Sequence, residues 1–217
     1  MTLEHDTVRE TLIDATIALM DEGGLQAVKA RALAQAVGVS VGTIYNLFGN
    51  VDGLVLAANQ RIYADLNTVG QANIGPIEER LAQRIAQGLV GDTARDRVRE
   101  RLLGLSEVYV DFVAANASRW SAVLTFDRNR STAETPEGYV EQLDAMIGII
   151  GRVLEAAPRC ADIGVRHQTA RALWSSVHGI VTLTYFSGDV ATSRDRTWAL
   201  IVILVSAVAD GLFVEPA

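Results

Sequence analysis

The chain has 217 residues, of which 49% are hydrophobic, and a formal net charge of −7 at pH 7. Its N-terminus is acidic and polar, unlike a signal peptide, and its longest apolar run, 200–205, is too short to span a bilayer. The single cysteine, Cys160, excludes an intramolecular disulfide and fits a reducing compartment. From these features together we expect a soluble, cytoplasmic protein with no membrane partner.

Residues 31–48, RALAQAVGVSVGTIYNLF, are predicted to form a helix, a tight turn and a second helix. Leu33, Ala34 and Val37 give the first helix one apolar face. Gly38 is expected to end that helix, because glycine adopts the left-handed backbone conformation without strain. The pattern is typical of a helix-turn-helix unit.

The second of these helices has one face for the core and one for another molecule. Ser40 is expected to cap it, and Ile44 and Phe48 lie four residues apart, so they share the inward face. The outward face suits a DNA major groove, because it offers a close backbone approach, a hydroxyl, a methyl and an amide. A simpler interpretation remains open, since the same geometry also occurs as mere packing in small helical units. The outward residues are Gly42, Thr43, Tyr45 and Asn46, of which Tyr45 is assigned to a phosphate.

The run 12–54 resembles the N-terminal domain of the TetR family of bacterial transcriptional regulators. The matching positions are Ala15, Gly24, Leu33-Ala34, Gly38-Val39-Ser40, Gly42-Thr43, Tyr45 and Phe48. The resemblance implies a three-helix helix-turn-helix domain over residues 1–50 that binds a double-stranded DNA operator. The DNA-binding residues that it predicts are Lys29, Arg31, Ser40, Val41, Gly42, Thr43, Tyr45 and Asn46.

Two departures from the family pattern affect the predicted contacts with DNA phosphates. Val28-Lys29-Ala30 stands where the family usually has a capping Ser or Thr, and Gly49-Asn50-Val51-Asp52 stands where it usually has a phosphate-binding lysine. Asn50 can still cap the helix that follows. Phosphate contacts then depend on Lys29, Arg31, Tyr45 and backbone N–H groups at helix starts.

The net charge argues against strong DNA binding, because phosphate affinity is largely electrostatic. The chain has 19 Lys plus Arg and 26 Asp plus Glu. Residues 23–51 contain no acid, however, and carry Lys29 and Arg31. We therefore expect modest nonspecific affinity, a shallow salt dependence, and specific binding that needs two copies of the domain.

Beyond Asn50 the chain reads as a series of helices. The helix from Pro76 is expected to bury Ile77, Leu81, Ile85 and Leu89, and Asp127–Thr135 is expected to be a loop. The predicted helices cover about 50–70, Pro76 to about 90, Val98–Phe112 and its flanks, a short segment with Trp120, Pro136 to about 157, 164–186 and 193–212. The last two are joined by a turn that contains Gly188.

The last two predicted helices are apolar nearly all round, so they must be buried on more than one side. In a chain of this size, the second side is most simply another copy of the chain. The resemblance implies the same, because TetR-like proteins dimerise through their last two helices in a four-helix bundle. A short match at Trp174, His178 and Gly179 resembles one subgroup of the family.

A small-molecule cavity between the helices is implied by the resemblance, and aromatic and aliphatic residues are the expected lining. Aromatic residues at helical spacing are more often core, and a histidine beside a tryptophan is more often a satisfied core residue, so both interpretations stay open. The candidates are Tyr109, Phe112, Trp120, Phe126, Tyr139, Met146, Trp174 and His178.

Enzymatic activity is not expected. The histidines, His5, His167 and His178, have no metal-ligand spacing, and no nucleophile or phosphate-binding motif is present. We therefore expect no catalytic residue, metal or cofactor.

The sequence thus predicts an all-α homodimer, with a helix-turn-helix DNA-binding domain over 1–50 and a helical ligand-binding and dimerisation domain over 51–217. The most economical function is a repressor that a small apolar or aromatic effector releases from a palindromic operator. Three alternatives remain: a helical binding protein that has lost DNA recognition, an activator, and a regulator controlled by a protein partner.

Overall fold

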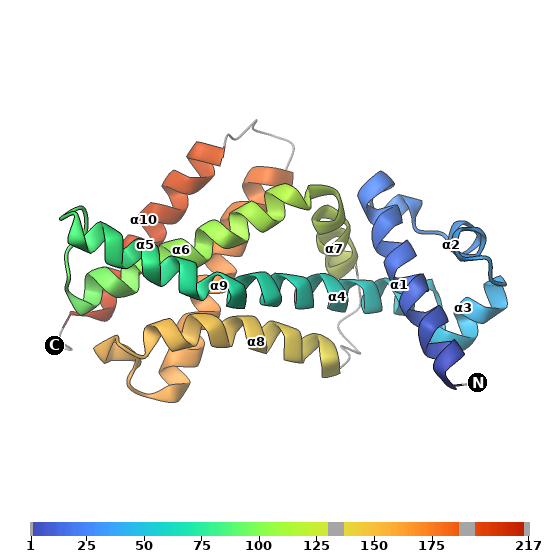
Figure 1. Ribbon diagram of the computed structural model, residues 1–217, viewed down its shortest axis with the longest axis horizontal. Coiled ribbons are helices and arrows are strands. Elements are labelled where there is room, and N and C mark those ends of the chain that lie inside the picture. The colour runs from blue at the N-terminus through green and yellow to red at the C-terminus, as the bar shows by residue number, and fades with distance from the viewer. Residues whose placement is uncertain (1, 130–136, 187–193, 215–217) are drawn as a thin grey trace. The chain divides into compact units, whose positions relative to one another are not determined.

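The computed structural model describes residues 2–129, 137–186 and 194–214, and these are helical with short connections. The helices are α1 Thr2–Gly23, α2 Ala30–Val37, α3 Val41–Phe48, α4 Val51–Ala72, α5 Ile74–Ala86, α6 Ala94–Ala115, α7 Ala117–Asn129, α8 Glu137–Leu154, α9 Ile163–Phe186 and α10 Arg194–Leu212, with single 3-10 turns at Leu25–Ala27 and Pro158–Cys160. Figure 1 labels these helices. The all-α fold is confirmed.

The chain packs as two compact units. Unit 1 comprises residues 1–65 and 113–140, and unit 2 comprises 66–112 and 141–217. This division differs from the predicted boundary after residue 50, because α7 packs against α1 and the first part of α4 belongs with the N-terminal helices. Both α4 and α6 contribute residues to each unit.

Unit 1 has a continuous apolar core. Its fully buried side chains come from successive helices and include Leu12, Met20, Leu33, Ile44 and Trp120. Ion pairs join α1 to its neighbours at the surface: the Arg119 guanidinium of α7 binds the Asp21 carboxylate through two nitrogens, one of them at 2.7 Å, and Arg61 of α4 pairs with Glu10. These contacts join α7 and α4 to α1 at the edge of the core.

In unit 2, α9 and α10 pack against each other, with Ala170, Leu173, Val177, Val181, Ile201, Val205 and Ala209 on their buried faces. The predicted bounds of both helices agree with the structure to within one residue. Gly188 and Pro136 lie outside the described residues. None of the helices in the described ranges has both the length and the apolar character needed to cross a membrane.

Two expectations about helix ends are wrong. Leu89 is 66% exposed rather than buried, because α5 ends at Ala86 and Gly88 reverses the chain with φ +69°. The predicted loop does not begin at Asp127, because α7 continues to Asn129. Asp127 accepts hydrogen bonds there from two tyrosine hydroxyls, those of Tyr63 and Tyr139, and these contacts favour the extended helix.

Candidate DNA-binding surface and ligand cavity

The turn between α2 and α3 has the predicted geometry. Gly38 adopts the left-handed conformation, with φ +77° and ψ 30°, and its N–H donates to the Ala34 carbonyl at 3.0 Å. Ser40 caps α3 by accepting a 3.1 Å hydrogen bond from the Thr43 N–H. Both predictions are confirmed. Each feature could be predicted because it depends on contacts within four residues along the chain.

The two faces of α3 differ in exposure as predicted. Ile44 is fully buried, whereas Gly42, Tyr45 and Asn46 are exposed, Tyr45 by 47%. Thr43, predicted to face outward, and Phe48, predicted to face inward, are each half-buried. The Thr43 hydroxyl lies 2.9 Å from the Ser40 hydroxyl, so part of its hydrogen-bonding capacity is used within the cap. Among the remaining predicted DNA-binding residues, Lys29, Arg31 and Ser40 are exposed and Val41 is half-buried.

The first turn of α2 lacks a side-chain cap, as the sequence indicates. Lys29 occupies the N-cap position and makes no side-chain hydrogen bond there. The start of α4 is capped by Asn50, whose side-chain oxygen accepts from the Gly53 N–H at 2.8 Å. A Cβ at position 53 would lie 2.2 Å from the Phe48 carbonyl oxygen, so glycine is required where α4 approaches the end of α3.

Arg9 of α1 holds the C-terminal end of α3, a role that the sequence did not reveal. Its guanidinium donates to the Leu47 carbonyl at 3.1 Å and lies 4.5 Å from the centre of the Phe48 ring. The last carbonyls of a helix have no partner within the helix and carry partial negative charge, so a cation stabilises that end. Arg9 therefore positions α3, although it lies 38 residues away in sequence.

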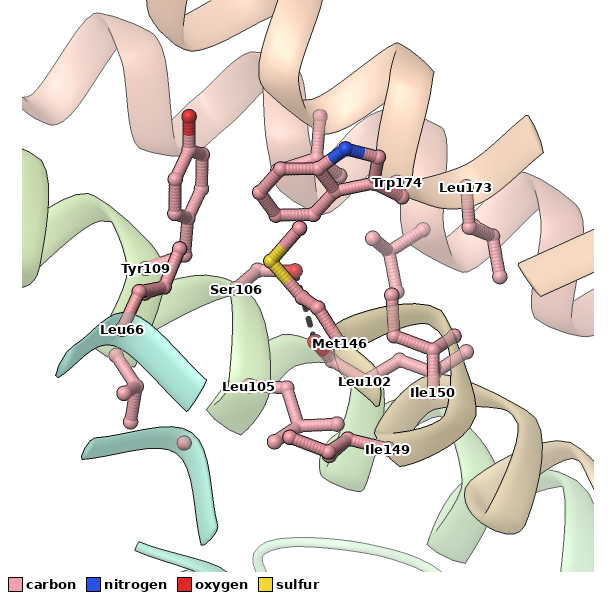
Figure 2. A pocket seen from close by; sticks show the side chains of 14 residues that line it. Leu66, Leu102, Leu105, Ser106, Tyr109, Met146, Ile149, Ile150, Leu173 and Trp174 are labelled. Carbon is pink, nitrogen blue, oxygen red and sulfur yellow. Dashed lines mark hydrogen bonds between the residues drawn. The ribbon is translucent and has the colours of Figure 1, made fainter. Parts of the chain in front are cut away.

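Unit 2 contains an apolar cavity of about 60 Å³, formed by residues of α4, α6, α8, α9 and α10. Figure 2 shows Met146 extending toward the indole of Trp174 across this space. No charged side chain lines it, and the Ser106 hydroxyl donates to the Leu102 carbonyl at 2.8 Å. The lining residues are Leu66, Gly70, Leu102, Leu105, Ser106, Val108, Tyr109, Met146, Ile149, Ile150, Leu173, Trp174, Val177 and Val205.

A polar group lies beside this cavity. The Tyr109 hydroxyl is 2.8 Å from Nδ1 of His178, and the His178 ring stacks on Trp174 with centroids 5.4 Å apart. Burial lowers the pKa of His178, which favours the neutral imidazole. Tyr109 and Trp174 thus line the cavity, while His178 fits the interpretation of a satisfied core histidine.

Four other residues that were predicted to line a pocket do not line this cavity. Trp120, Phe126 and Tyr139 belong to unit 1, where each is at least 92% buried, and Phe112 is half-buried in unit 2 but is not part of this cavity lining. Tyr63 meets Trp120 and Tyr139 edge-on, with ring centroids 5.5 Å and 5.2 Å apart. Burial raises the pKa of the Tyr63 hydroxyl. These aromatic residues form a core cluster.

Comparison with known proteins matches both units. A family model for bacterial regulatory proteins of the TetR family matches residues 12–58, and one for the tetracyclin repressor-like C-terminal domain matches residues 102–205. A crystal structure of a TetR transcriptional regulator from Rhodococcus sp. RHA1 is 16% identical and covers 98% of this chain and 99% of its own, with a TM-score of 0.60. That likeness is one of fold.

Two curated relatives are similar over shorter stretches. The HTH-type transcriptional repressor KstR of Rhodococcus jostii is 29% identical over 107 residues, which are 49% of this chain and 50% of the repressor. The HTH-type transcriptional regulator BetI 2 of Chromohalobacter salexigens is 38% identical over 71 residues, 33% of this chain and 34% of that protein. The chain thus spans half or less of these relatives.

The two family models together extend over most of the described helices, and the first of them includes the Gly38 turn, the Ser40 cap and the exposed face of α3. The fold agrees with that of a solved member over nearly the whole chain. The chain belongs to the TetR family of bacterial regulatory proteins.

Proposed function

We propose that this protein is a homodimeric transcriptional repressor whose α3 helices enter the major grooves of a palindromic operator. The observation that carries the proposal is the exposed face of a capped helix, with Gly42, Tyr45 and Asn46 outward and Ile44 buried. Arg9 and Gly53 fix the far end of the same helix. Repression, rather than activation, is favoured by the similarity to a curated repressor.

Dimerisation through α9 and α10 is supported by their exposed apolar side chains. Leu183 and Ile203 are each 67% exposed and Leu200 is 43% exposed, which is unfavourable for a helix facing water. A Cβ added to Gly179 would meet nothing within 4 Å, so α9 presents a small residue at which another helix could approach closely. Two-fold pairing of these faces would bury the stripe and set the separation of the two α3 helices.

DNA binding is tested by fluorescence anisotropy with duplexes from the region flanking the protein's own gene, over a range of salt concentrations. Lys29 and Arg31 are the cations that the exposed surface near α3 offers, so a dimer neutralises about four phosphates and the logarithmic salt slope should be close to −4. A slope near −10 would contradict this view of the surface. Absence of binding even at low salt would favour a binding protein that has lost DNA recognition.

We further propose that the effector is an uncharged apolar molecule that enters the cavity in unit 2. Ligand pockets usually have about 300–1,000 Å³, far more than the 60 Å³ found there, so binding requires the surrounding helices to separate. Residues of α4 line the cavity, and the same helix begins beside α3. An effector that binds the opened form better would therefore favour a different placement of α3 and release the operator.

The effector proposal is tested by thermal unfolding with a library of apolar compounds. A true effector at about 100 times its dissociation constant should add about 2.7 kcal/mol to the free energy of unfolding. Trp174→Ala, which alters the cavity lining, should reduce the shift, and Phe112→Ala, half-buried in unit 2 but outside this lining, should not. Equal shifts in both variants would place the compound elsewhere. A library without any hit would favour control by a protein partner.

A further inference from the structure

A second, larger cavity lies in unit 2 between α5, α6 and α10. Its volume is about 570 Å³, within the usual range for small-molecule sites, and its lining is part polar and part apolar. It is distinct from the apolar cavity, because the two have no lining residue in common.

The polar side of this groove carries arginines with unused donors. Arg80 contacts Glu107 at 3.2 Å and Arg84 contacts Glu100 at 2.9 Å, so each guanidinium, which has five N–H donors, has one carboxylate partner. The side chains of Arg80 and Arg84 are 53% and 52% exposed, whereas that of Glu100 is 12% exposed. An entering molecule therefore meets the guanidiniums before it meets the Glu100 carboxylate.

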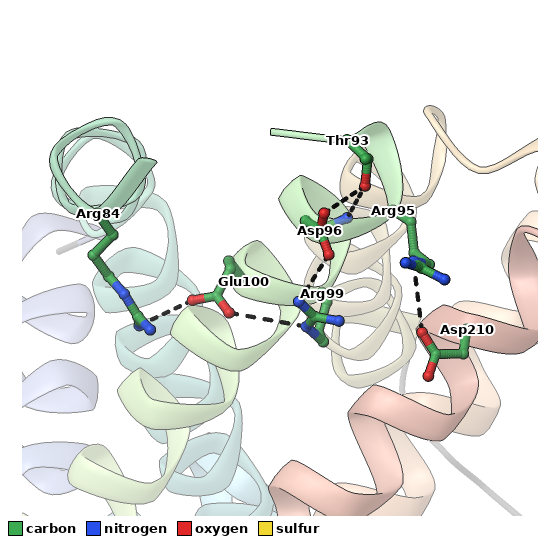
Figure 3. A network of polar contacts seen from close by, with 7 residues as sticks. All are labelled: Arg84, Thr93, Arg95, Asp96, Arg99, Glu100 and Asp210. Carbon is green, nitrogen blue, oxygen red and sulfur yellow. Dashed lines mark hydrogen bonds and ion pairs between the residues drawn. The ribbon is translucent and has the colours of Figure 1, made fainter. Parts of the chain in front are cut away.

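Glu100 is further restrained by its neighbours. Figure 3 shows the Glu100 carboxylate between Arg84 and Arg99, and Arg99 in turn binds Asp96 at 2.9 Å. Asp96 also accepts a 2.6 Å hydrogen bond from the Thr93 hydroxyl. Arg99 is only 25% exposed, whereas Arg80 and Arg84 are about half exposed, so these two are the guanidiniums that an anionic ligand reaches first, with the 35% exposed Glu107 carboxylate beside Arg80.

The apolar side of the groove is made by Leu81 of α5, Leu103 of α6, and Trp198 and Val202 of α10. The indole of Trp198 is half-buried. Trp198 and Val202 lie one turn apart on α10, each about 160° around the helix from Leu200, and Val202 is about 100° from Ile203. The groove therefore lies on the side of α10 away from Leu200, and Val202 is its residue nearest to the proposed dimer stripe.

Ion pairs between α6 and α10 stand at both ends of the groove. Arg95 pairs with Asp210 at 3.7 Å near one end, and Arg194 donates to Asp111 at 2.6 Å near the other. These contacts connect the two helices on either side of the residues that line the groove. The groove-lining residues of α6 and α10 thus lie between these two pairs along both helices, and Arg80 and Arg84 of α5 are exposed beside them.

We propose that this groove is a second binding site, for an amphipathic monocarboxylate. The carboxylate would accept hydrogen bonds from Arg80 and Arg84, and the hydrocarbon body would lie on Leu103, Trp198 and Val202. An uncharged molecule of the same shape would gain no charge-assisted hydrogen bond from the remaining N–H donors of Arg80 and Arg84, so the groove favours a carboxylate. The apolar cavity has no charged lining residue, so it disfavours a charged ligand.

Tryptophan quenching tests the proposal, because bromine quenches indole fluorescence only at contact distance. The chain has three tryptophans, Trp120, Trp174 and Trp198. Titration with ω-bromoundecanoate should quench the wild-type protein saturably. The quenching should persist in Trp174→Phe and be lost in Trp198→Phe, and ω-bromoundecanol should bind the groove at least tenfold more weakly.

Arg80→Gln should weaken the carboxylate about tenfold, because a charge-assisted hydrogen bond is lost. Arg171→Gln is the matched control, since Arg171 is 51% exposed and has one carboxylate partner at 3.2 Å. Equal affinities of these two variants, quenching lost in Trp174→Phe instead, or no quenching at all would overturn the proposal. None of these measurements involves DNA, so the proposed repressor function is judged separately.

Discussion

Replacing Tyr45 with alanine is expected to weaken operator binding by more than about a hundredfold. Tyr45 is 47% exposed on α3 and is assigned a phosphate contact. A hydrogen bond to a charged group contributes about 1.5–3 kcal/mol, and a dimer loses it twice, so the loss is at least about 3 kcal/mol. Anisotropy with operator DNA measures this effect. Tyr45→Phe, which removes only the hydroxyl, should lose most of the same affinity.

The fold and the dimer should survive these changes, because the exposed Tyr45 side chain contributes little to the core. Ile203→Asp provides the contrast, since it puts a carboxylate into the exposed apolar stripe of α10. That variant should be monomeric in analytical ultracentrifugation and should lose operator binding together with dimerisation. Normal operator binding by Tyr45→Ala would mean that another face contacts DNA. A dimeric Ile203→Asp would place the interface elsewhere.

Replacing Trp120 with alanine should lower the free energy of unfolding by about 3–5 kcal/mol, the usual cost of removing a fully buried aromatic side chain. Trp120 is 0% exposed and its ring meets Tyr63 edge-on at 5.5 Å, in the cluster that also contains Tyr139. The measurement is equilibrium unfolding in urea. The slope of the unfolding free energy against urea concentration should stay unchanged, because a changed slope would indicate an altered denatured state.

Trp174→Ala is the matched control for this loss. Trp174 is half-buried and lies beside a cavity, so its neighbours can rearrange and its removal should cost less than half as much. A small loss in Trp120→Ala, with altered effector binding, would assign Trp120 to a pocket after all. Comparable losses for the two tryptophans would mean that the apolar cavity is as tightly packed as the core.

Local features of the DNA-binding unit were predictable from the sequence. The Gly38 turn, the Ser40 cap and the Asn50 cap each join atoms no more than four residues apart, so residue type and spacing determine them. The buried face of α3 follows from helical period in the same way, since Ile44 returns to the core whenever the helix forms. The all-α fold rests on the same regular spacing of apolar residues.

Contacts between distant segments were not predictable. Arg9 binds the Leu47 carbonyl across 38 residues, and Asp127 joins the Tyr63 and Tyr139 hydroxyls from within a stretch whose composition indicates a loop. Helical period marks Trp120 and Trp174 alike as inward-facing. Only packing distinguishes them, because it places one in a filled core and the other beside a cavity.

The amino-acid sequence by itself thus determined the helices, the helix-turn-helix and the outward face of α3, because these depend on backbone conformation and short-range hydrogen bonds. The tertiary structure decided which aromatic residues border open space, how α3 is held at its far end, and where Arg80, Arg84 and Trp198 meet to form a groove. Those outcomes depend on how side-chain volumes and charges from distant helices fit together, which no local pattern specifies.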